Sequence, residues 1–292
     1  MTTTTEPISR TVPTPRGDLY VTDSPGDEPP FVLMHGFPDD SHIYDRLVPL
    51  LAPRRVITFD FLGYGRSDRE VATTETLTSH DDDLAAVVDA LDLDDMTLVA
   101  HDASGSVAVD YVIDHPGRAR HLVLLNTYYG HAPMLRLPDM IRLFADEHIT
   151  ALAGALTTDP NQRLWLLQHT AKQFGNEDVD PNGVEAIAVL PAFFGDDAHA
   201  DALPAIRAWT ATLFDDLDRQ DQRIASGHLA NLDARVSLVF GADDPCLRPD
   251  LARHLAGLFP AAAVRIVERA SHWVQWDQPD VVAQLLAEAV LA

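Results

Sequence analysis

Short apolar runs alternate with longer amphipathic segments over the first 129 residues of the chain. Runs typical of buried strands occur at residues 31–34, 55–60, 96–100 and 121–125, and two shorter runs at 8–12 and 19–22 flank a turn. Apolar residues at helical spacing occur over residues 41–51, 76–91 and 104–115. Strands that alternate with helices in this way predict a mostly parallel sheet with helices on both faces.

The alternation stops at about residue 129. Helical patterns then occur at residues 140–144, 163–174 and 203–217, without a run typical of a buried strand. The alternation resumes with strands at 236–240 and 263–267 and helices at 249–258 and 281–291. We therefore predict an α/β core domain with an eight-stranded sheet, made of residues 1–129 and 233–292. Residues 130–232 are predicted to form a helical cap inserted after the sixth strand.

Composition and charge limit the class of protein. Of the 292 residues 46% are apolar, which is enough for a folded core. The 45 acidic and 21 basic residues give a net charge of −24, which disfavours nucleic acid and anionic membranes as partners. Cys246 is the only cysteine, so a reducing compartment suits the chain. Neither a signal peptide nor a membrane span of ~20 apolar residues is present, so we expect a soluble cytoplasmic protein, monomeric or homodimeric.

The candidate chemistry is concentrated in residues 96–106, Met-Thr-Leu-Val-Ala-His-Asp-Ala-Ser-Gly-Ser. An apolar strand runs into a turn and then into a helical pattern, with Asp102 at the apex. Small residues surround the apex, namely Ala100, Ser104 and Gly105. A tight turn of this kind holds its apex side chain clear of the backbone, as a nucleophile elbow requires.

Five motifs on fitting elements carry a resemblance to a known family. They are, in chain order, His-Gly-Phe-Pro at 35–38, Gly-Tyr-Gly-Arg-Ser-Asp at 63–68, the turn at Asp102, Gly-Ala-Asp-Asp-Pro at 241–245 and Ser-His at 271–272. Together they resemble the α/β-hydrolase superfamily over nearly the whole chain. The His-Asp pair at the turn, with His-Gly-Phe-Pro, looks like the branch with an aspartate nucleophile. That branch includes epoxide hydrolases, haloalkane dehalogenases and haloacetate dehalogenases, and it typically carries an inserted helical cap.

This resemblance implies a set of roles for individual residues. An aspartate is already ionised at neutral pH, so Asp102 can attack an sp3 carbon and form an ester with it. Water then hydrolyses the ester, with His272 as the candidate base and Asp244 as the carboxylate that orients it. The backbone N–H groups of Phe37 and Ala103 are the candidate oxyanion hole, because the superfamily uses the residue after the nucleophile and one from the loop after the third strand.

Several residue assignments have alternatives in the sequence. Aspartate favours helix N-caps, so Asp102 is also a candidate cap, and Ser104 is a second candidate nucleophile in the same turn. Asp243 competes with Asp244 for the role of the acid, and the family spacing Gly-x-x-Asp favours Asp244. His272 is one of 13 histidines, but it follows the last strand, where the family places its base.

The residues that stabilise a leaving group are less well defined. Epoxide hydrolases of this branch use cap tyrosines as proton donors, and no tyrosine follows Tyr129 here. Haloalkane dehalogenases bind halide with a tryptophan directly after the nucleophile and often an asparagine at the position of Phe37. This chain has Ala103 after the nucleophile, where haloacetate dehalogenases carry an arginine. We favour epoxide hydrolysis, with haloalkane or haloacid dehalogenation, ester or lactone hydrolysis, and non-catalytic ligand binding as alternatives.

Other side chains are candidates for the substrate pocket. Tyr128 and Tyr129 stand where the cap begins, and aromatic residues within the cap are expected to line an apolar cavity for a small hydrophobic substrate. The candidate pocket residues are Tyr128, Tyr129, Trp165, His169, Trp209 and Trp273. The sequence contains no metal-ligand cluster, phosphate-binding glycine loop or cofactor lysine, so no cofactor is expected.

Overall fold

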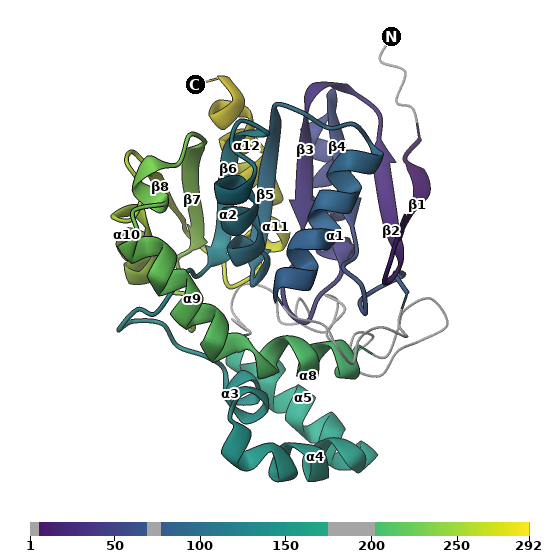
Figure 1. Cartoon of the computed structure of the whole chain (residues 1–292), viewed down its shortest axis with the longest axis vertical. Coiled ribbons are helices and arrows are strands. Elements are labelled where there is room, and N and C mark those ends of the chain that lie inside the picture. Colours follow the sequence, from purple (N-terminus) through teal and green to yellow (C-terminus); the bar gives the residue numbers. More distant parts are fainter. Residues whose placement is uncertain (1–5, 69–76, 175–201, 292) are drawn as a thin grey trace.

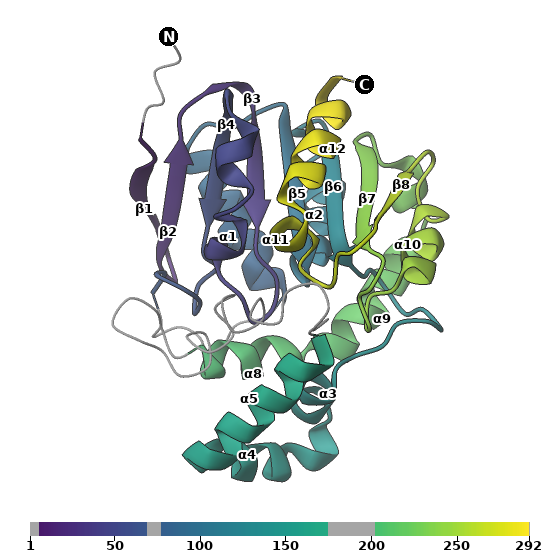
Figure 2. The ribbon, with the colours of Figure 1, turned by 180° about the vertical axis from the view of Figure 1, so that it is seen from behind.

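The structure is a computed structural model that describes residues 6–68, 77–174 and 202–291. The strands of these residues form one eight-stranded sheet in the order β1-β2-β4-β3-β5-β6-β7-β8 (Figures 1 and 2). The strands are β1 (Ile8–Thr14), β2 (Gly17–Ser24), β3 (Asp27–Met34), β4 (Arg54–Phe59), β5 (Met96–Asp102), β6 (Ala119–Thr127), β7 (Arg235–Gly241) and β8 (Ala263–Val267). The predicted fold class, an α/β-hydrolase fold with a mostly parallel eight-stranded sheet, is confirmed.

The direction of the strands follows from their connections. A short turn joins β1 to β2, so these strands pair antiparallel, and β2 also pairs antiparallel with β4. The remaining pairs are parallel, because each connection crosses over through helical or irregular segments. Val32, Leu98 and Leu122 pair across three neighbouring strands in the middle of the sheet. This register brings the carboxyl ends of β3, β5 and β6 to one edge.

Helices cover both faces of the sheet. The core helices are α1 (Leu77–Ala90), α2 (Ser104–Asp114), α10 (Pro249–Ala256), α11 (Val274–Asp277) and α12 (Pro279–Leu291). Helices α1 and α2 lie on the face seen in Figure 1, and α11 and α12 lie on the opposite face, seen in Figure 2. The strands between them are nearly continuous apolar runs because both of their faces are buried.

Two of the predicted helices differ from those in the structure. Residues 41–51 form two single turns, η1 (Ser41–Tyr44) and η2 (Val48–Leu51), rather than one helix. Asp40 does cap the first turn, and Pro49, which has no N–H to continue an earlier helix, is the second residue of the second turn. The predicted helix at 203–217 is divided at Thr212, whose hydroxyl bonds the Trp209 carbonyl and the Asp216 carboxylate.

The segment between β6 and β7 contains helices and no strand in its described part. It contains α3 (Asp139–Ala145), η3 (Glu147–Ile149), α4 (Thr150–Thr158), α5 (Pro160–Phe174), α8 (Leu203–Ala211), α9 (Leu213–Ala225) and η4 (Leu229–Asn231). Helices α3, α4, α5 and α8 lie beyond the edge of the sheet at which the parallel strands end (Figures 1 and 2). The prediction of a separate cap over 130–232 remains a prediction, and its residues 175–201 lie outside the described residues. No helix within the described ranges is long and apolar enough to cross a membrane.

Gly105 tests how closely the core is packed at the turn after β5, and Gly154, a helical glycine without close neighbours, is its control. A Cβ on Gly105 in α2 would lie 2.0 Å from Oγ1 of Thr127, whereas one on Gly154 in α4 would meet only Arg207, at 3.8 Å. We expect Gly105→Ala to lower the free energy of unfolding by ~1–3 kcal/mol through overpacking. Gly154→Ala should raise it by ~0.5–1 kcal/mol because alanine favours the helix. Urea denaturation of both variants checks this, and equal effects would contradict it.

Candidate active site

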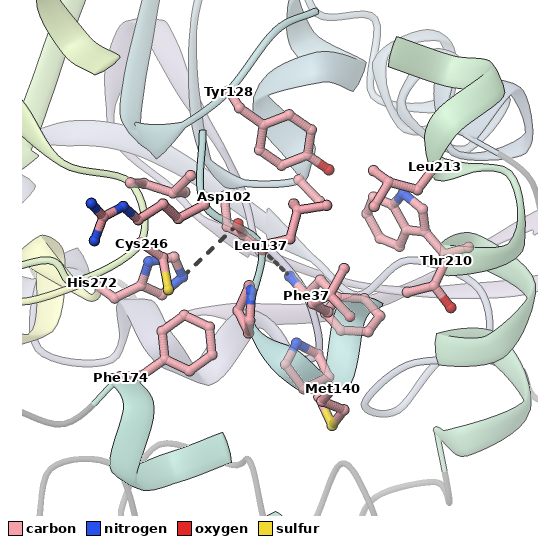
Figure 3. Close-up of a pocket in the computed structure, with 17 residues that line it drawn as sticks. Phe37, Asp102, Tyr128, Leu137, Met140, Phe174, Thr210, Leu213, Cys246 and His272 are labelled. Carbon is pink, nitrogen blue, oxygen red and sulfur yellow. Dashed lines mark hydrogen bonds and ion pairs between the residues drawn. The ribbon is translucent and has the colours of Figure 1, made fainter. Parts of the chain in front are cut away.

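The turn after β5 holds Asp102 in a strained backbone conformation at the wall of a pocket (Figure 3). Asp102 has φ of 52°, a left-handed value that is uncommon for a residue with a Cβ. A Cβ on Gly36 would lie only 2.5 Å from the Asp102 Cβ, so the loop after β3 approaches the turn closely because it has a glycine there. The Thr127 hydroxyl donates a hydrogen bond to the Asp102 carbonyl.

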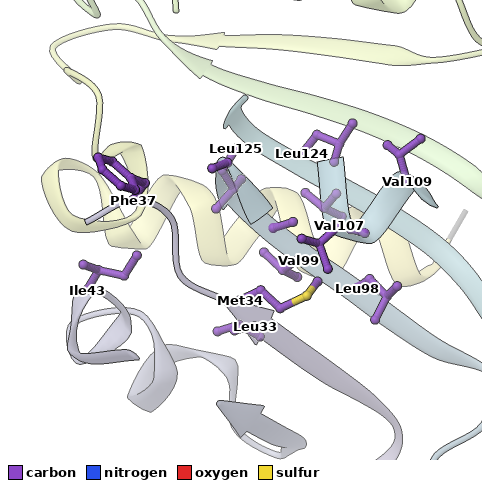
Figure 4. Packing of buried hydrophobic residues seen from close by; sticks show 14 of the residues in the cluster. Leu33, Met34, Phe37, Ile43, Leu98, Val99, Val107, Val109, Leu124 and Leu125 are labelled. Carbon is purple, nitrogen blue, oxygen red and sulfur yellow. The ribbon is translucent and has the colours of Figure 1, made fainter. Parts of the chain in front are cut away.

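A dense apolar core supports this turn from below. Figure 4 shows buried side chains of β3, β5, β6 and α2 packed together, among them Met34, Val99, Val107 and Leu125. Each of these four is at most 1% exposed. Because such a core resists repacking, the turn and its side chain are held in one geometry.

Both predicted oxyanion-hole residues contact the Asp102 carboxylate. The Phe37 N–H donates to Oδ2 over 3.0 Å, and the Ala103 N–H also bonds this carboxylate. Oδ1 lies 3.9 Å from Nε2 of His272, which is too far for a hydrogen bond but close enough for an electrostatic interaction. One carboxylate oxygen thus occupies the donor site, and the other lies near the imidazole.

Asp244 and His272 form the second half of the site. His272 Nδ1 lies 2.8 Å from Oδ2 of Asp244, which makes it the donor in the neutral ring. Oδ1 of Asp244 accepts hydrogen bonds from the N–H groups of Cys246 and Leu247 at 2.8 and 2.9 Å. The carboxylate therefore holds the ring with Nε2 turned toward Asp102.

Asn126 is a supporting residue that the sequence analysis missed. Its side-chain amide donates to Oδ2 of Asp244 over 2.7 Å and accepts from the Gly241 N–H over 3.0 Å. Asn126 also has a positive φ of 35° and is fully buried. The available signal was a single amide at the end of an otherwise apolar strand, because a buried polar side chain needs partners.

Burial and neighbouring charges set the pKa values of the site. Burial raises the pKa of Asp102, an effect that the charge of His272 and the two backbone N–H groups only partly offset. Burial acts the same way on Asp244, but His272 and two N–H donors outweigh it and lower its pKa. For His272, burial lowers the pKa, while Asp244, Asp102 and Asp39 together raise it to about 9. In the free protein His272 is therefore a cation between carboxylates at neutral pH.

A third buried carboxylate lies behind the histidine. Asp39 accepts a hydrogen bond from Nε1 of Trp273 over 3.0 Å, and its Oδ2 lies 3.8 Å from Nδ1 of His101. His101 in turn contacts the His272 carbonyl through Nε2 at 2.9 Å. Burial raises the pKa of Asp39 to about 7 despite the Trp273 bond and the His272 charge. This network positions the segment that carries His272.

The structure contradicts the alternative residue assignments. Ser104 is fully buried, and its hydroxyl bonds the carbonyls of Met34 and His101 instead of facing the pocket. Helix α2 is capped at Ala103 without a side-chain bond, so Asp102 is not its cap. Asp243 is exposed, whereas Asp244 contacts His272.

The pocket beside Asp102 and His272 lies between the core and the helices beyond the sheet edge (Figure 3). Its lining is mainly apolar, with Leu137, Met140, Phe174 and Leu213 among the side chains that surround the carboxylate. Phe174, the last residue of α5, lies 4.7 Å from the His272 ring, measured between ring centroids. A small, largely apolar molecule suits such walls.

Only two of the six candidate pocket residues line this pocket, namely Tyr128 and Trp209. Tyr129 donates its hydroxyl to Asp110 in α2, because the next residue of an extended chain points to the other side. Trp165 is 56% exposed and stacks on His169, which itself pairs with Asp139 at the surface. Trp273 turns its indole N–H to Asp39. These four residues are therefore not among the described residues that line this pocket.

Two hydrogen-bond donors that line the pocket are available to a ligand. The Tyr128 hydroxyl and the indole N–H of Trp209 have no hydrogen-bond partner within the described part of the chain. Figure 3 shows the Tyr128 hydroxyl directed across the pocket toward the side of Leu213. Burial, followed by the charges of Asp102 and Asp216, raises the pKa of Tyr128 well above 10, so its proton stays on. Both groups can donate to an electronegative atom of a ligand.

Metal chemistry has no evident place among these side chains. Residues 6–68, 77–174 and 202–291 contain no group of three or more histidine, cysteine, aspartate or glutamate side chains arranged to hold a metal ion. The thiol of Cys246 lines the pocket, and burial followed by the Asp244 charge raises its pKa to about 12. It is therefore a neutral wall residue and not a ready ligand.

Comparison with known proteins agrees with the fold. The model of the α/β hydrolase fold family matches residues 29–279. Haloalkane dehalogenase 1 of Mycobacterium tuberculosis is 30% identical over 267 residues, which cover 88% of this chain and 82% of that protein. Haloalkane dehalogenase 2 of the same species is 25% identical over 286 residues, with 96% and 94% covered. The solved structure of the Cif epoxide hydrolase from Acinetobacter nosocomialis superposes with a TM-score of 0.78 at 16% identity, covering 97% and 89% of the two chains.

The chain belongs to the α/β-hydrolase family and is related to haloalkane dehalogenases. It is a hydrolase, and the prediction of an enzyme is confirmed.

The charge of Asp244 should control the protonation of His272. We expect Asp244→Asn to bring the pKa of His272 from about 9 to its ordinary value of 6.5 or lower. Because the folded pKa is raised, the stability it contributes is fully present below pH 6.5 and is lost as pH rises through 9. The loss of unfolding free energy in Asp244→Asn should therefore be larger at pH 6 than at pH 10. NMR titration of the ring and urea denaturation check both points.

Asp243→Asn is the matched control, because it removes the same charge from the adjacent, exposed position. An equal shift of the His272 pKa in both variants would contradict the role of the direct contact.

Proposed function

We propose that this hydrolase works through a covalent ester between Asp102 and its substrate, and that the substrate is a small hydrophobic epoxide. The observation that carries the proposal is the Asp102 carboxylate, with Oδ2 on the Phe37 N–H and Oδ1 3.9 Å from His272. A serine at this point would need a base before it attacked, whereas a carboxylate is already ionised.

In the first step Oδ1 of Asp102 attacks the electrophilic carbon of the substrate. A carbon–oxygen bond to the enzyme forms, and the bond from that carbon to the leaving group breaks. The positive charge of His272 lies close to the attacking carboxylate and favours its ionised form. The apolar walls exclude water and hold the carbon near the oxygen.

In the second step water hydrolyses the ester. His272 takes a proton from water, whose oxygen adds to Cγ of Asp102. The Cγ–Oδ1 bond then breaks, and Oδ1 leaves with the substrate carbon as an alcohol that receives a proton from the ring. Oδ2, which accepts from the Phe37 N–H, carries the developing negative charge, and the Ala103 N–H also bonds this carboxylate. The free carboxylate is then restored.

The change of charge at Asp102 couples the two steps. Before attack, the charges of Asp244, Asp102 and Asp39 keep the pKa of His272 at about 9. Esterification removes the charge of Asp102, so the pKa of His272 falls and the ring can give up its proton and act as a base. His272 thereby assists attack as a cation and hydrolysis as a neutral ring.

Tyr128 favours an epoxide as the substrate. Opening of an epoxide leaves an alkoxide, which needs a proton, and the Tyr128 hydroxyl faces the pocket without another partner in the described residues. Tyr128 would thus replace the cap tyrosines that are absent from the sequence after Tyr129. The product is a diol.

A haloalkane is the second candidate substrate. The relatives at 30% and 25% identity are haloalkane dehalogenases, and the Trp209 indole N–H is a free donor that could bind a halide. A halide leaves as a stable anion and needs no proton, so Tyr128 would be dispensable. Against this candidate, Ala103 and Phe37 occupy the positions where such enzymes carry halide-binding residues.

Trapping of the ester tests the mechanism. We expect His272→Gln to form the ester and fail to hydrolyse it, because attack by the Asp102 carboxylate needs no base, whereas hydrolysis does. Incubation with matched epoxides, haloalkanes and esters, followed by mass spectrometry, should show a substrate-sized mass increase on the peptide with Asp102. The compound that gives the increase identifies the substrate class.

Two control variants accompany this experiment. Asp102→Ala should give no adduct, and His228→Gln, which changes an exposed histidine, should turn over like the wild-type enzyme. A compound that the wild type hydrolyses without any adduct in His272→Gln would overturn the proposal.

A pair of adjacent tyrosines separates the two substrate classes. We expect Tyr128→Phe to slow ester formation from epoxides ~100-fold or more, since general acids typically contribute that much. Tyr129→Phe, which loses only the contact with Asp110, should leave this rate unchanged. Stopped-flow or quenched single-turnover rates measure both. Unchanged epoxide rates in Tyr128→Phe would exclude Tyr128 as the proton donor.

A further inference from the structure

One pocket residue has no role in the chemistry described above. Arg136 lies in the connection between β6 and α3, and it lines the same pocket as Asp102 and His272. It is exposed to solvent, and most of the other residues of the lining are apolar. In Figure 3 the labelled neighbours Leu137, Met140 and Phe174 enclose the space around the carboxylate.

The charge of Arg136 is not neutralised by a neighbour. Within the described part of the chain it forms neither an ion pair nor a side-chain hydrogen bond, and among the described lining residues it is the only arginine or lysine. Asp139, three residues on, is engaged with His169 and Gln173. Cys246, on the same wall, is a neutral thiol. The guanidinium is thus free to bind a ligand.

The positive charge of Arg136 is opposite in sign to the net charge of the chain. A net charge of −24 disfavours the approach of an anion, so an anionic ligand needs a local cation at the site it enters. Guanidinium groups bind carboxylates through two parallel hydrogen bonds. The apolar wall formed by Leu137, Met140 and Leu213 suits the carbon chain that would connect such a group to the reacting carbon.

We propose that the preferred substrates of this pocket carry a carboxylate at the end remote from the reacting carbon, and that Arg136 binds this carboxylate. The inference rests on the proposed function, because the reacting end is the one that Asp102 attacks. Arg136 acts in binding and selection, and it takes no part in the bond changes at the other end.

Matched pairs of substrates test the inference. Each pair shares one reacting group, an epoxide or a halide, and one chain length, and ends in either a carboxylate or the neutral primary amide. In Arg136→Gln we expect the KM for the carboxylates to rise ~10- to 100-fold, as loss of a charge-assisted bidentate contact implies. The KM for the amides and kcat for both should stay close to wild type. Arg136→Lys should recover part of the loss.

Arg142→Gln is the matched control. Arg142 lies on α3, is exposed and does not line the pocket, and the variant changes the net charge by the same amount. An equal rise of KM for carboxylates in both variants would show that the two arginines attract the anionic substrate only at long range. That result would overturn the inference. A parallel loss of kcat for amides and carboxylates in Arg136→Gln would place Arg136 in leaving-group stabilisation and would also overturn it.

A binding measurement separates this inference from the proposed function. Calorimetry with a dihydroxycarboxylate, the diol expected as product from an epoxide that ends in a carboxylate, needs no turnover. If no compound of the panel is turned over but this ligand binds the wild type and binds Arg136→Gln at least ~10-fold more weakly, the proposed function fails and the carboxylate site stands. If the two proteins bind it equally, or neither binds it, the inference fails whatever the activity.

Discussion

The left-handed backbone of Asp102, with φ of 52°, is the constraint on which the rest of the site depends. Strain of this kind costs on the order of 1–3 kcal/mol and persists only where the surroundings hold it. Here the surroundings are the apolar core beneath the turn and two close approaches, at Gly36 and at Gly105. Because the turn cannot relax, the carboxylate stays between the N–H group of Phe37 and the ring of His272.

The geometry of the site also depends on the balance of charge around the imidazole of His272. Three carboxylates, those of Asp244, Asp102 and Asp39, surround His272, and each is buried or partly buried. An isolated buried charge is costly, so each carboxylate has donors or a cation beside it. Asp244 has the fullest set, with the ring, two backbone N–H groups and Asn126. Asp244 is accordingly the one of these three carboxylates whose pKa is lowered.

The two sides of the pocket come from different parts of the chain. Asp102, His272 and the N–H groups of Phe37 and Ala103 stand at or after the ends of sheet strands, which a rigid sheet positions. The opposite walls come from the connection after β6 and from α3, α5 and α8, and they include Tyr128, Arg136 and Trp209. The first side carries the motifs of the family to which the chain belongs, whereas the second side is the one that selects the substrate in the function we propose. Relatives that share the first side can therefore act on different compounds.

The sequence by itself determined the order of strands and helices, the turn at Asp102 and the pairing of Asp244 with His272, because local periodicity and short motifs carry that information. It could not determine which side chains meet across the pocket. Tyr128 faces the cavity and Tyr129 faces Asp110, although they are adjacent in the chain. Only the tertiary structure decided that difference, since it depends on how segments far apart in sequence pack against one another. For the same reason the sequence did not reveal the support that Asn126 gives to Asp244.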